Sequence, residues 1–131
     1  MARRFPFYQQ LDAMDCGPSC LRMISAFYGK HFSLQYLRAN SYLDREGVSL
    51  QGVSEAAERI GLQTLGVKIP LESEDPERPG LRDAPLPCIL HWQQKHFVVL
   101  FRLSKKHAWI ADPGKGIRKI TLAELKRNWL S

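Results

Sequence analysis

The first half of the chain carries apolar residues at the three- and four-residue spacing of amphipathic helices. We predict helices over 16–28, from just after Ser33, and over roughly 50–60. Gly29 and Gly61 follow the first and third of these segments, where glycine commonly ends a helix in the left-handed conformation. The apolar face of the first helix is broad, which predicts that this helix is largely buried.

The second half of the chain predicts strands instead. Short apolar runs at 88–92, 96–103 and 108–111 have the length of strands in a sheet. The segment 63–69 is a further candidate strand. The segment 70–87 is rich in proline and charged residues, which predicts an irregular surface loop.

A helix signal stands near the end of the chain. Thr121-Leu-Ala-Glu124 has the spacing of a capping box and predicts a helix that ends near Trp129. Helices followed by strands, without alternation, predict an α+β fold with N-terminal helices packed on a C-terminal antiparallel sheet. The 131 residues suit a single domain over 1–131. No apolar run is long enough to cross a membrane.

Charge and cysteine content narrow the functional classes. The net charge of +6 suits an anionic partner, but the basic residues are dispersed in pairs without interleaved aromatics, which argues against nucleic acid. Three cysteines, and an N-terminus without an apolar signal segment, favour reduced thiols. A metal site is also disfavoured, because no second cysteine pair completes four ligands.

Cys16 is the residue whose position points to chemistry. Gly17 permits a tight turn after it, and Pro18 is tolerated in the first turn of a helix. A thiol at a helix N-terminus meets unpaired N–H groups and the positive end of the helix dipole, which favour the nucleophilic thiolate. Cys20 and Cys88 lie in apolar segments, and we interpret them as core residues.

His96 is the best-placed base for such a thiol. If 96–103 and 107–112 form a hairpin, His96 lies opposite Asp112 or the residue that follows it. A carboxylate beside an imidazole fixes its tautomer and stabilises the imidazolium. The other histidines gain no carboxylate in this way and are interpreted as surface or hydrogen-bonded residues. They are His31, His91 and His107, of which His91 is expected to line a cleft.

Gln10 completes the candidate site. It precedes Cys16 in a segment expected to be extended, which could fold back beside the thiol. A side-chain amide there could donate to the oxyanion of a tetrahedral intermediate, with the Cys16 backbone N–H as second donor. The adjacent Gln9 offers the same group, and we interpret Asp12 and Asp15 as turn and capping residues.

The chain also contains four segments in a distinctive order. They are Gln10-x5-Cys16-Gly17-Pro18-Ser19-Cys20-Leu21, Tyr28-Gly29, His91-Trp92…His96-Phe97-Val98-Val99-Leu100 and Asp112-Pro113. Over roughly residues 7–130 this pattern resembles the N-terminal cysteine peptidase domains of bacteriocin-processing ABC transporters. The resemblance implies a papain-like fold. It also implies cleavage of leader peptides after a double glycine, on the cytoplasmic side of the membrane, before the cargo is exported.

The resemblance assigns roles to the residues that match it. The nucleophile falls on Cys16 and the general base on His96, while the orienting carboxylate falls on Asp112 and the oxyanion donor on Gln10. A preference for double glycine implies a narrow slot, with Trp92 as a candidate wall. The leader would lie as an amphipathic helix in an apolar groove. The candidate groove residues, which also fit a place in the core, are Tyr28, Tyr36, Leu37, Tyr42 and Leu43.

The chain departs from this family in length. It has no membrane-spanning segment and no Walker-type loop, since Gly61-x4-Gly66 is followed by Val67 rather than lysine. We expect one soluble peptidase domain without a cofactor, either excised from a longer transporter or free-standing. ATP and magnesium are expected only for the transporter portion. The expected partners are a precursor peptide and the transporter's transmembrane and nucleotide-binding domains.

Two other functions stay open at this point. A non-cleaving leader-binding domain would bind its leader, keep that binding in Cys16→Ala, and leave the peptide intact. A nucleic-acid-binding protein would use the dispersed basic pairs, and its retention on DNA would fall steeply with salt. The four matching catalytic positions favour the peptidase over both.

Overall fold

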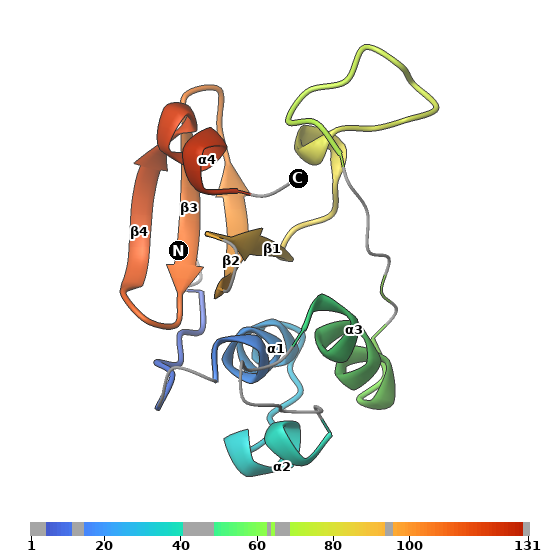
Figure 1. Ribbon diagram of the computed structural model, residues 1–131, viewed down its shortest axis with the longest axis vertical. Helices are drawn as coiled ribbons and strands as arrows, with labels where there is room; N and C mark the ends of the chain where they lie inside the picture. Colours follow the sequence, from blue (N-terminus) through green and yellow to red (C-terminus); the bar gives the residue numbers. More distant parts are fainter. Residues whose placement is uncertain are drawn as a thin grey trace.

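The computed structural model describes residues 5–11, 15–40, 49–62, 64, 69–93 and 96–129. Within these residues, helices flank a four-stranded antiparallel sheet (Figure 1). The helices are α1 (Cys16–Phe27), α2 (Leu34–Ala39), α3 (Leu50–Arg59), the short 3-10 helix η1 (Leu81–Asp83) and α4 (Leu122–Asn128). The strands are β1 (Cys88–Trp92), β2 (His96–Leu103), β3 (His107–Asp112) and β4 (Gly116–Thr121), adjacent in that order.

The three N-terminal helices lie where the sequence predicts them. Ser33 and Ser49 cap α2 and α3, because each hydroxyl accepts a hydrogen bond from a backbone N–H of the first turn, at 3.1 and 3.0 Å. Gly29 and Gly61 follow α1 and α3 with φ of +84° and +94°, which is the left-handed conformation expected there. Ser25 of α1 is buried, although serine is more often exposed.

The C-terminal helix is also confirmed, but the strand before it is a new feature. Thr121 Oγ1 accepts a hydrogen bond from the Glu124 N–H at 3.2 Å and so caps α4. β4 had no signal in the hydrophobic pattern, because Ile120 is its only buried residue and the strand lies at the edge of the sheet. Charged side chains on an exposed edge strand also discourage pairing with another chain.

The segment over 70–87 is largely irregular, as predicted, apart from the short helix η1. Of the expected strand over 63–69, only Thr64 and Ile69 fall within the described residues, and neither belongs to a strand. In the loop that follows, Leu71 and Leu81 are buried although their neighbours are largely exposed. The loop is therefore a surface segment anchored to the core by a few apolar side chains.

The sheet separates two hydrophobic cores. Phe97 and Val99 of β2 face the core shared with α1, α2 and α3. Val98 and Leu100 face the core shared with α4 and the long loop. Because successive side chains of a strand point to opposite faces, β2 supplies both cores, and its sequence is almost continuously apolar. α1 lies between the sheet and α2 (Figure 1), and its main contact with the sheet is with β2.

Candidate active site

Cys16 is the first residue of α1 and is buried at the face of the helix that meets the sheet. The Asp15 carbonyl accepts the first helical hydrogen bond, from the Ser19 N–H at 2.9 Å. Pro18 lies in the first turn, where its missing N–H removes no helical hydrogen bond. The thiol therefore occupies the predicted place at a helix N-terminus.

His96 and Asp112 are joined at the adjacent ends of β2 and β3. His96 Nε2 lies 2.6 Å from Asp112 Oδ1. Asp112 is buried, and the side chain of His96 keeps 24% of its surface exposed. The same carboxylate oxygen accepts a hydrogen bond from the Gly114 N–H at 2.9 Å, which fixes its orientation. The expected pairing of an imidazole with a carboxylate is therefore present.

This pair forms through a different register from the one predicted. Val99 lies opposite Ala111, beyond an irregularity in the pairing of β2 with β3. Continued along the strands, that register makes His96 and Asp112 diagonal neighbours rather than direct partners. The predicted direct pair is wrong because the hairpin closes with Leu103 opposite Ala108, a wider turn than the count assumed, and the irregularity between Leu100 and Arg102 shifts the register by only one residue.

His96 is held between a carboxylate and the thiol. Burial lowers the pKa of His96, but hydrogen bonds with Asp112 and Cys16, and the negative charges of both, raise it from 6.5 to about 9. Since Nε2 faces Asp112, Nδ1 is the nitrogen left for the thiol. Burial raises the pKa of Asp112, yet its hydrogen bonds with His96 and Gly114 bring it below the ordinary value of 3.8. This arrangement favours the imidazolium form of His96 beside the thiol.

Gln10 lies beside the same pair. Its backbone N–H donates to the Pro113 carbonyl at 2.8 Å, which ties the N-terminal segment to the turn after β3. A Cβ atom placed on Gly114 would lie 3.4 to 3.7 Å from side-chain atoms of Asp112, Gln10 and His96. Gly114 thus marks the point where these three side chains converge.

Sequence reasoning missed the contribution of this turn to the site. Asp112-Pro-Gly-Lys-Gly116 reads as a turn after a strand, and it does connect β3 to β4. Its signal was available, because an aspartate commonly accepts a hydrogen bond from the N–H two residues later. That N–H is the one of Gly114, so the turn orients the carboxylate that holds His96.

Asp15 occupies the N-cap position of α1, which agrees with its interpretation as a capping residue, but its side chain has another use; Asp12 lies outside the described residues. The Asp15 side chain makes no capping hydrogen bond to α1. Both of its oxygens instead accept hydrogen bonds from Arg38 of α2, at 2.6 and 2.7 Å. The two residues lie far apart in sequence, and no local pattern announces their contact.

The other two cysteines have different surroundings. Cys20 lies one helical turn after Cys16 and is fully buried, which confirms its interpretation as a core residue. Burial, followed by the negative charges of Cys16 and Asp112, raises the pKa of Cys20. Cys88 is half-buried at the start of β1, and burial raises its pKa to about 12. Both are poor nucleophiles, because the thiolate is the reactive form.

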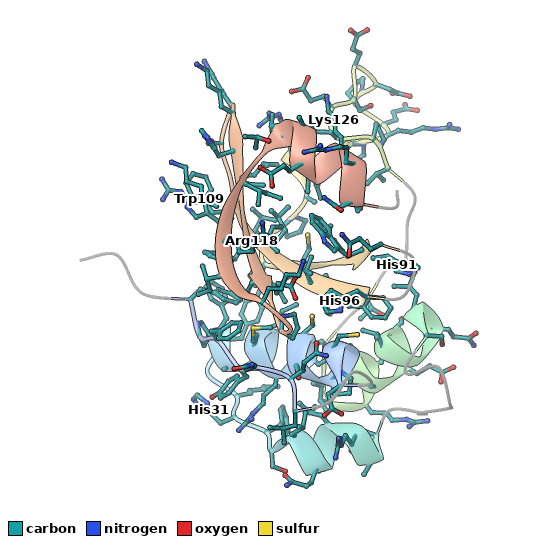
Figure 2. The ribbon with its side chains drawn as sticks, turned by 60° about the vertical axis from the view of Figure 1, so that its left-hand side comes forward. His31, His91, His96, Trp109, Arg118 and Lys126 are labelled. Carbon is teal, nitrogen blue, oxygen red and sulfur yellow. The ribbon has the colours of Figure 1, made fainter. Side chains whose placement is uncertain are left out.

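The remaining histidines lie outside the hydrogen-bonded pair. The His91 ring stacks on Phe97 with centroids 5.2 Å apart, on the sheet face that carries the helices. His107 packs near Trp109, and His31 is exposed after α1. Figure 2 shows His91 and His96 at the same end of the sheet, whereas His31 lies among the helices.

The proposed substrate-contacting residues separate into three groups. Trp92 and Leu37 are buried in the two different cores, so neither lines a surface slot or groove in this structure, and both expectations are corrected. Trp92 faces the second core because it alternates with His91 along β1. Tyr28 and Tyr36 are 56% and 46% exposed and remain available to a ligand. Tyr42 and Leu43 lie outside the described residues.

The described residues offer neither a cluster of metal-ligating side chains nor a membrane-spanning helix. No group of three or more histidine, cysteine, aspartate or glutamate residues there could hold a metal ion. No helix in the same part of the chain is both long and apolar enough to cross a membrane.

The family match and the similar proteins of known sequence agree on one family. The model of the peptidase C39 family matches residues 4–131. The colicin V secretion/processing ATP-binding protein of Escherichia coli is 37% identical over 125 residues, covering 95% of this chain. The lactococcin-G-processing and transport ATP-binding protein of Lactococcus lactis is 34% identical over 126 residues, covering 93% of it. The chain spans 17% of the length of each of these relatives.

Solved structures agree with this assignment. A double glycine motif protease from an AMS/PCAT transporter, in complex with the leader peptide, superposes with a TM-score of 0.81 at 35% identity, over 96% of this chain and 86% of that one. The peptidase domain of Streptococcus ComA gives a TM-score of 0.84 at 24% identity, over 96% and 93% of the two chains, and supports the fold.

Proposed function

The chain belongs to the peptidase C39 family, and from that premise we propose that it cleaves precursor peptides after a double glycine at the end of their leaders. Within this family the chain is a cysteine peptidase domain with a papain-like fold. The observation that carries the proposal is the hydrogen-bonded series of Cys16, His96 and Asp112 at the N-terminus of α1.

The reaction we propose is acyl transfer to water. The Cys16 thiolate attacks the carbonyl carbon of the second glycine, and the imidazolium of His96 then protonates the leaving amine. Water, activated by neutral His96, hydrolyses the thioester and releases the leader as a carboxylic acid. Asp112 holds the His96 ring with Nδ1 toward the thiol, supported by the 2.6 Å contact at Nε2.

Gln10 is our proposed oxyanion donor. Its Oε1 is buried on the side of Gly114, which turns the amide NH2 the other way. Together with the Cys16 backbone N–H, this NH2 would hold the developing negative charge of the tetrahedral intermediate. One donor is part of the backbone of α1 and the other is the Gln10 amide, and both are in place before the substrate binds. They therefore need little rearrangement during the reaction.

The substrate class rests on the relatives. The matched Escherichia coli and Lactococcus lactis proteins are named for secretion or transport and for processing, and one structural neighbour is bound to a leader peptide. For this chain, the exposed Tyr28 and Tyr36 are the surface aromatics that we propose contact the leader. The positive net charge of +6 suits an acidic leader.

We further propose that this domain, with its core at about residues 7–130, works as part of a longer ABC transporter. Its partners there would be transmembrane and nucleotide-binding domains, and ATP and magnesium would serve only the latter. The peptidase would then act on the cytoplasmic side of the membrane. The family assignment and the ATP-binding relatives support this setting.

Peptide cleavage by the purified chain tests the proposal. The substrates are a synthetic leader ending in Gly-Gly, joined to a short cargo, and the same peptide ending in Ala-Ala. We expect mass spectrometry to find cleavage after the second glycine and none in the Ala-Ala peptide. Cys16→Ala should bind the leader without cutting it, whereas Cys20→Ala, one turn further along α1, should still cut.

Two results would contradict this function. Binding of the Gly-Gly peptide by the parent chain without any cleavage would identify a leader-binding domain instead. Cleavage that persists in Cys16→Ala would remove Cys16 from the mechanism. In both experiments, circular dichroism of each variant establishes that the comparison is between folded proteins.

A further inference from the structure

A buried ion pair stands directly before the proposed nucleophile. The Asp15 side chain has no exposed surface, and Arg38 of α2 keeps 35% of its side chain exposed. Arg38 Nε lies 2.6 Å from Asp15 Oδ1, and its Nη2 lies 2.7 Å from Oδ2. The guanidinium therefore holds both carboxylate oxygens in a two-pronged contact, the strongest geometry for this pair.

The contact diverts Asp15 from the task its position suggests. Aspartate at a helix N-cap normally accepts a hydrogen bond from an N–H of the first turn. One usual donor is absent, because Pro18 has no N–H. Asp15 makes no such bond to α1, although its backbone carbonyl accepts the Ser19 N–H as an N-cap should. The side chain faces α2 instead of the N-terminus that carries the thiol.

This diversion matters electrostatically for the thiol. A carboxylate folded over the start of α1 would occupy the N–H groups and the positive dipole that stabilise a thiolate there. The Asp15 carboxylate would also add negative charge beside the negative charge that forms on the Cys16 thiolate. Among the described residues, the ionisable groups that interact with Cys16 include His96, whose ring Asp112 holds, and Cys20, one turn along the helix.

We propose that Arg38 is a positioning residue that keeps the Asp15 carboxylate off the N-terminus of α1, so that this N-terminus serves the Cys16 thiolate and the oxyanion. The inference rests on the proposed function, since it concerns the same nucleophile. Arg38 contacts the side chain of the residue directly before Cys16, whose N–H is the proposed backbone oxyanion donor. It acts through Asp15, so its loss changes the catalytic step rather than substrate binding.

The decisive variants are Arg38→Gln and the double variant Asp15→Asn/Arg38→Gln. In Arg38→Gln the buried Asp15 carboxylate loses the two charged hydrogen bonds from the guanidinium, and we expect it to turn toward α1. We expect kcat to fall by about 10- to 100-fold with KM changed less than about threefold. Alkylation of Cys16 by iodoacetamide should slow in parallel, and its pH profile should move to higher pH. The double variant removes the carboxylate charge, so it should regain most of the lost rate.

Arg82→Gln is the matched control. It breaks the ion pair with Glu72, which has a nitrogen–oxygen distance of 2.7 Å but belongs to the long loop. We expect its alkylation profile and kcat to equal those of the parent chain. If Arg38→Gln does not fold, Arg38→Lys replaces it. Lysine keeps the positive charge but not the two-pronged contact, so the carboxylate is only partly held. The alkylation rate and kcat should then fall together, and adding Asp15→Asn to Arg38→Lys should restore both.

The outcomes separate this inference from the proposed function. If Arg38→Gln is folded and both rates stay within about twofold of the parent chain, the inference is overturned while peptide cleavage stands. Equal loss in the single and double variants would also overturn it, because an anchor without a charge effect gives no rescue. If no leader is cut, but Arg38→Gln slows alkylation and the double variant restores it, the inference stands and the cleavage proposal fails.

Discussion

The fold changes the pKa of His96. Its pKa is raised to about 9 by Asp112 and Cys16, so the imidazolium persists well above neutral pH. In the proposed mechanism the imidazolium must be present to protonate the leaving amine. Activity should therefore hold through neutral pH and fall as pH rises through about 9, when His96 loses its proton.

Asp112→Asn tests that assignment. An amide cannot stabilise the imidazolium as a carboxylate does, so the pKa of His96 should fall back toward its ordinary value of 6.5. The alkaline limb of kcat/KM should move to lower pH in this variant, with kcat reduced by about 100-fold or more. Rates measured from about pH 5 to about pH 10 would give both limbs. An unmoved alkaline limb would mean that another group sets it.

Gln10 should act on the transition state alone. Gln10→Ala removes the proposed oxyanion donor while the backbone N–H that binds the Pro113 carbonyl remains. We expect kcat to fall by about 100- to 1,000-fold with little change in KM. Iodoacetamide forms no oxyanion, so alkylation of Cys16 should proceed at the parental rate. Parallel loss of alkylation would show that Gln10 organises the thiol instead. Gln9→Ala, on the exposed neighbour, is the matched control.

The turn between β3 and β4 offers a contrast between two glycines. A Cβ atom on Gly114 would meet Asp112, Gln10 and His96 at 3.4 to 3.7 Å, which leaves room for a methyl group but not for a branched side chain. Gly116 has φ of +105° and open space around it. The first glycine therefore constrains the site, whereas the second constrains only the backbone of the turn.

We predict opposite effects from substitutions at these positions. Gly114→Val should lower kcat by about tenfold or more, because it displaces side chains that must stay within fractions of an ångström. Gly116→Ala should lower the free energy of unfolding by about 1 kcal/mol through backbone strain and leave kcat unchanged. Thermal unfolding and peptide cleavage, measured on both variants, provide the comparison. Full activity in Gly114→Val would show that the site tolerates crowding from this turn.

The elements differ in how far local sequence could predict them. α2, α3 and α4 begin directly after Ser33, Ser49 and Thr121, whose hydroxyls cap them. A hydrogen bond between residues close in sequence therefore marks the start of each helix. β4 lacks an apolar pattern because only Ile120 is buried. An edge strand is defined by pairing with β3, which is a contact between separate segments and leaves a weak trace in its own residues.

The same distinction applies within the candidate site. The place of Cys16 at a helix N-terminus could be predicted from the adjacent residues, because Gly17 and Pro18 are typical of a helix start. The Asp15–Arg38 pair and the diagonal contact of His96 with Asp112 depend on how α2 and the sheet are placed. A long-range ion pair and the exact register of a hairpin have no signature at fixed spacing, so only the folded structure reveals them.

The two hydrophobic cores differ in what they contribute to the candidate site. The core between the sheet and α1, α2 and α3 supports the N-terminus of α1, where Cys16 lies. The core under α4 and the long loop packs on the other face of the sheet. Both contribute to stability, but only the first contains Cys16 and so holds the proposed nucleophile beside His96. Stability and activity should therefore respond differently to equivalent damage in each core.

Leu37 and Leu125 make that comparison direct, because both are fully buried leucines, one in each core. Leu37→Ala and Leu125→Ala should each lower the free energy of unfolding by about 2–5 kcal/mol. At a temperature where both variants are folded, Leu37→Ala should lower kcat by about tenfold, because α2 carries Arg38 and packs on α1. Leu125→Ala should keep kcat within about twofold of the parent chain. If the two leucines affected kcat equally, the whole sheet, rather than the helical core alone, would set the geometry of the site.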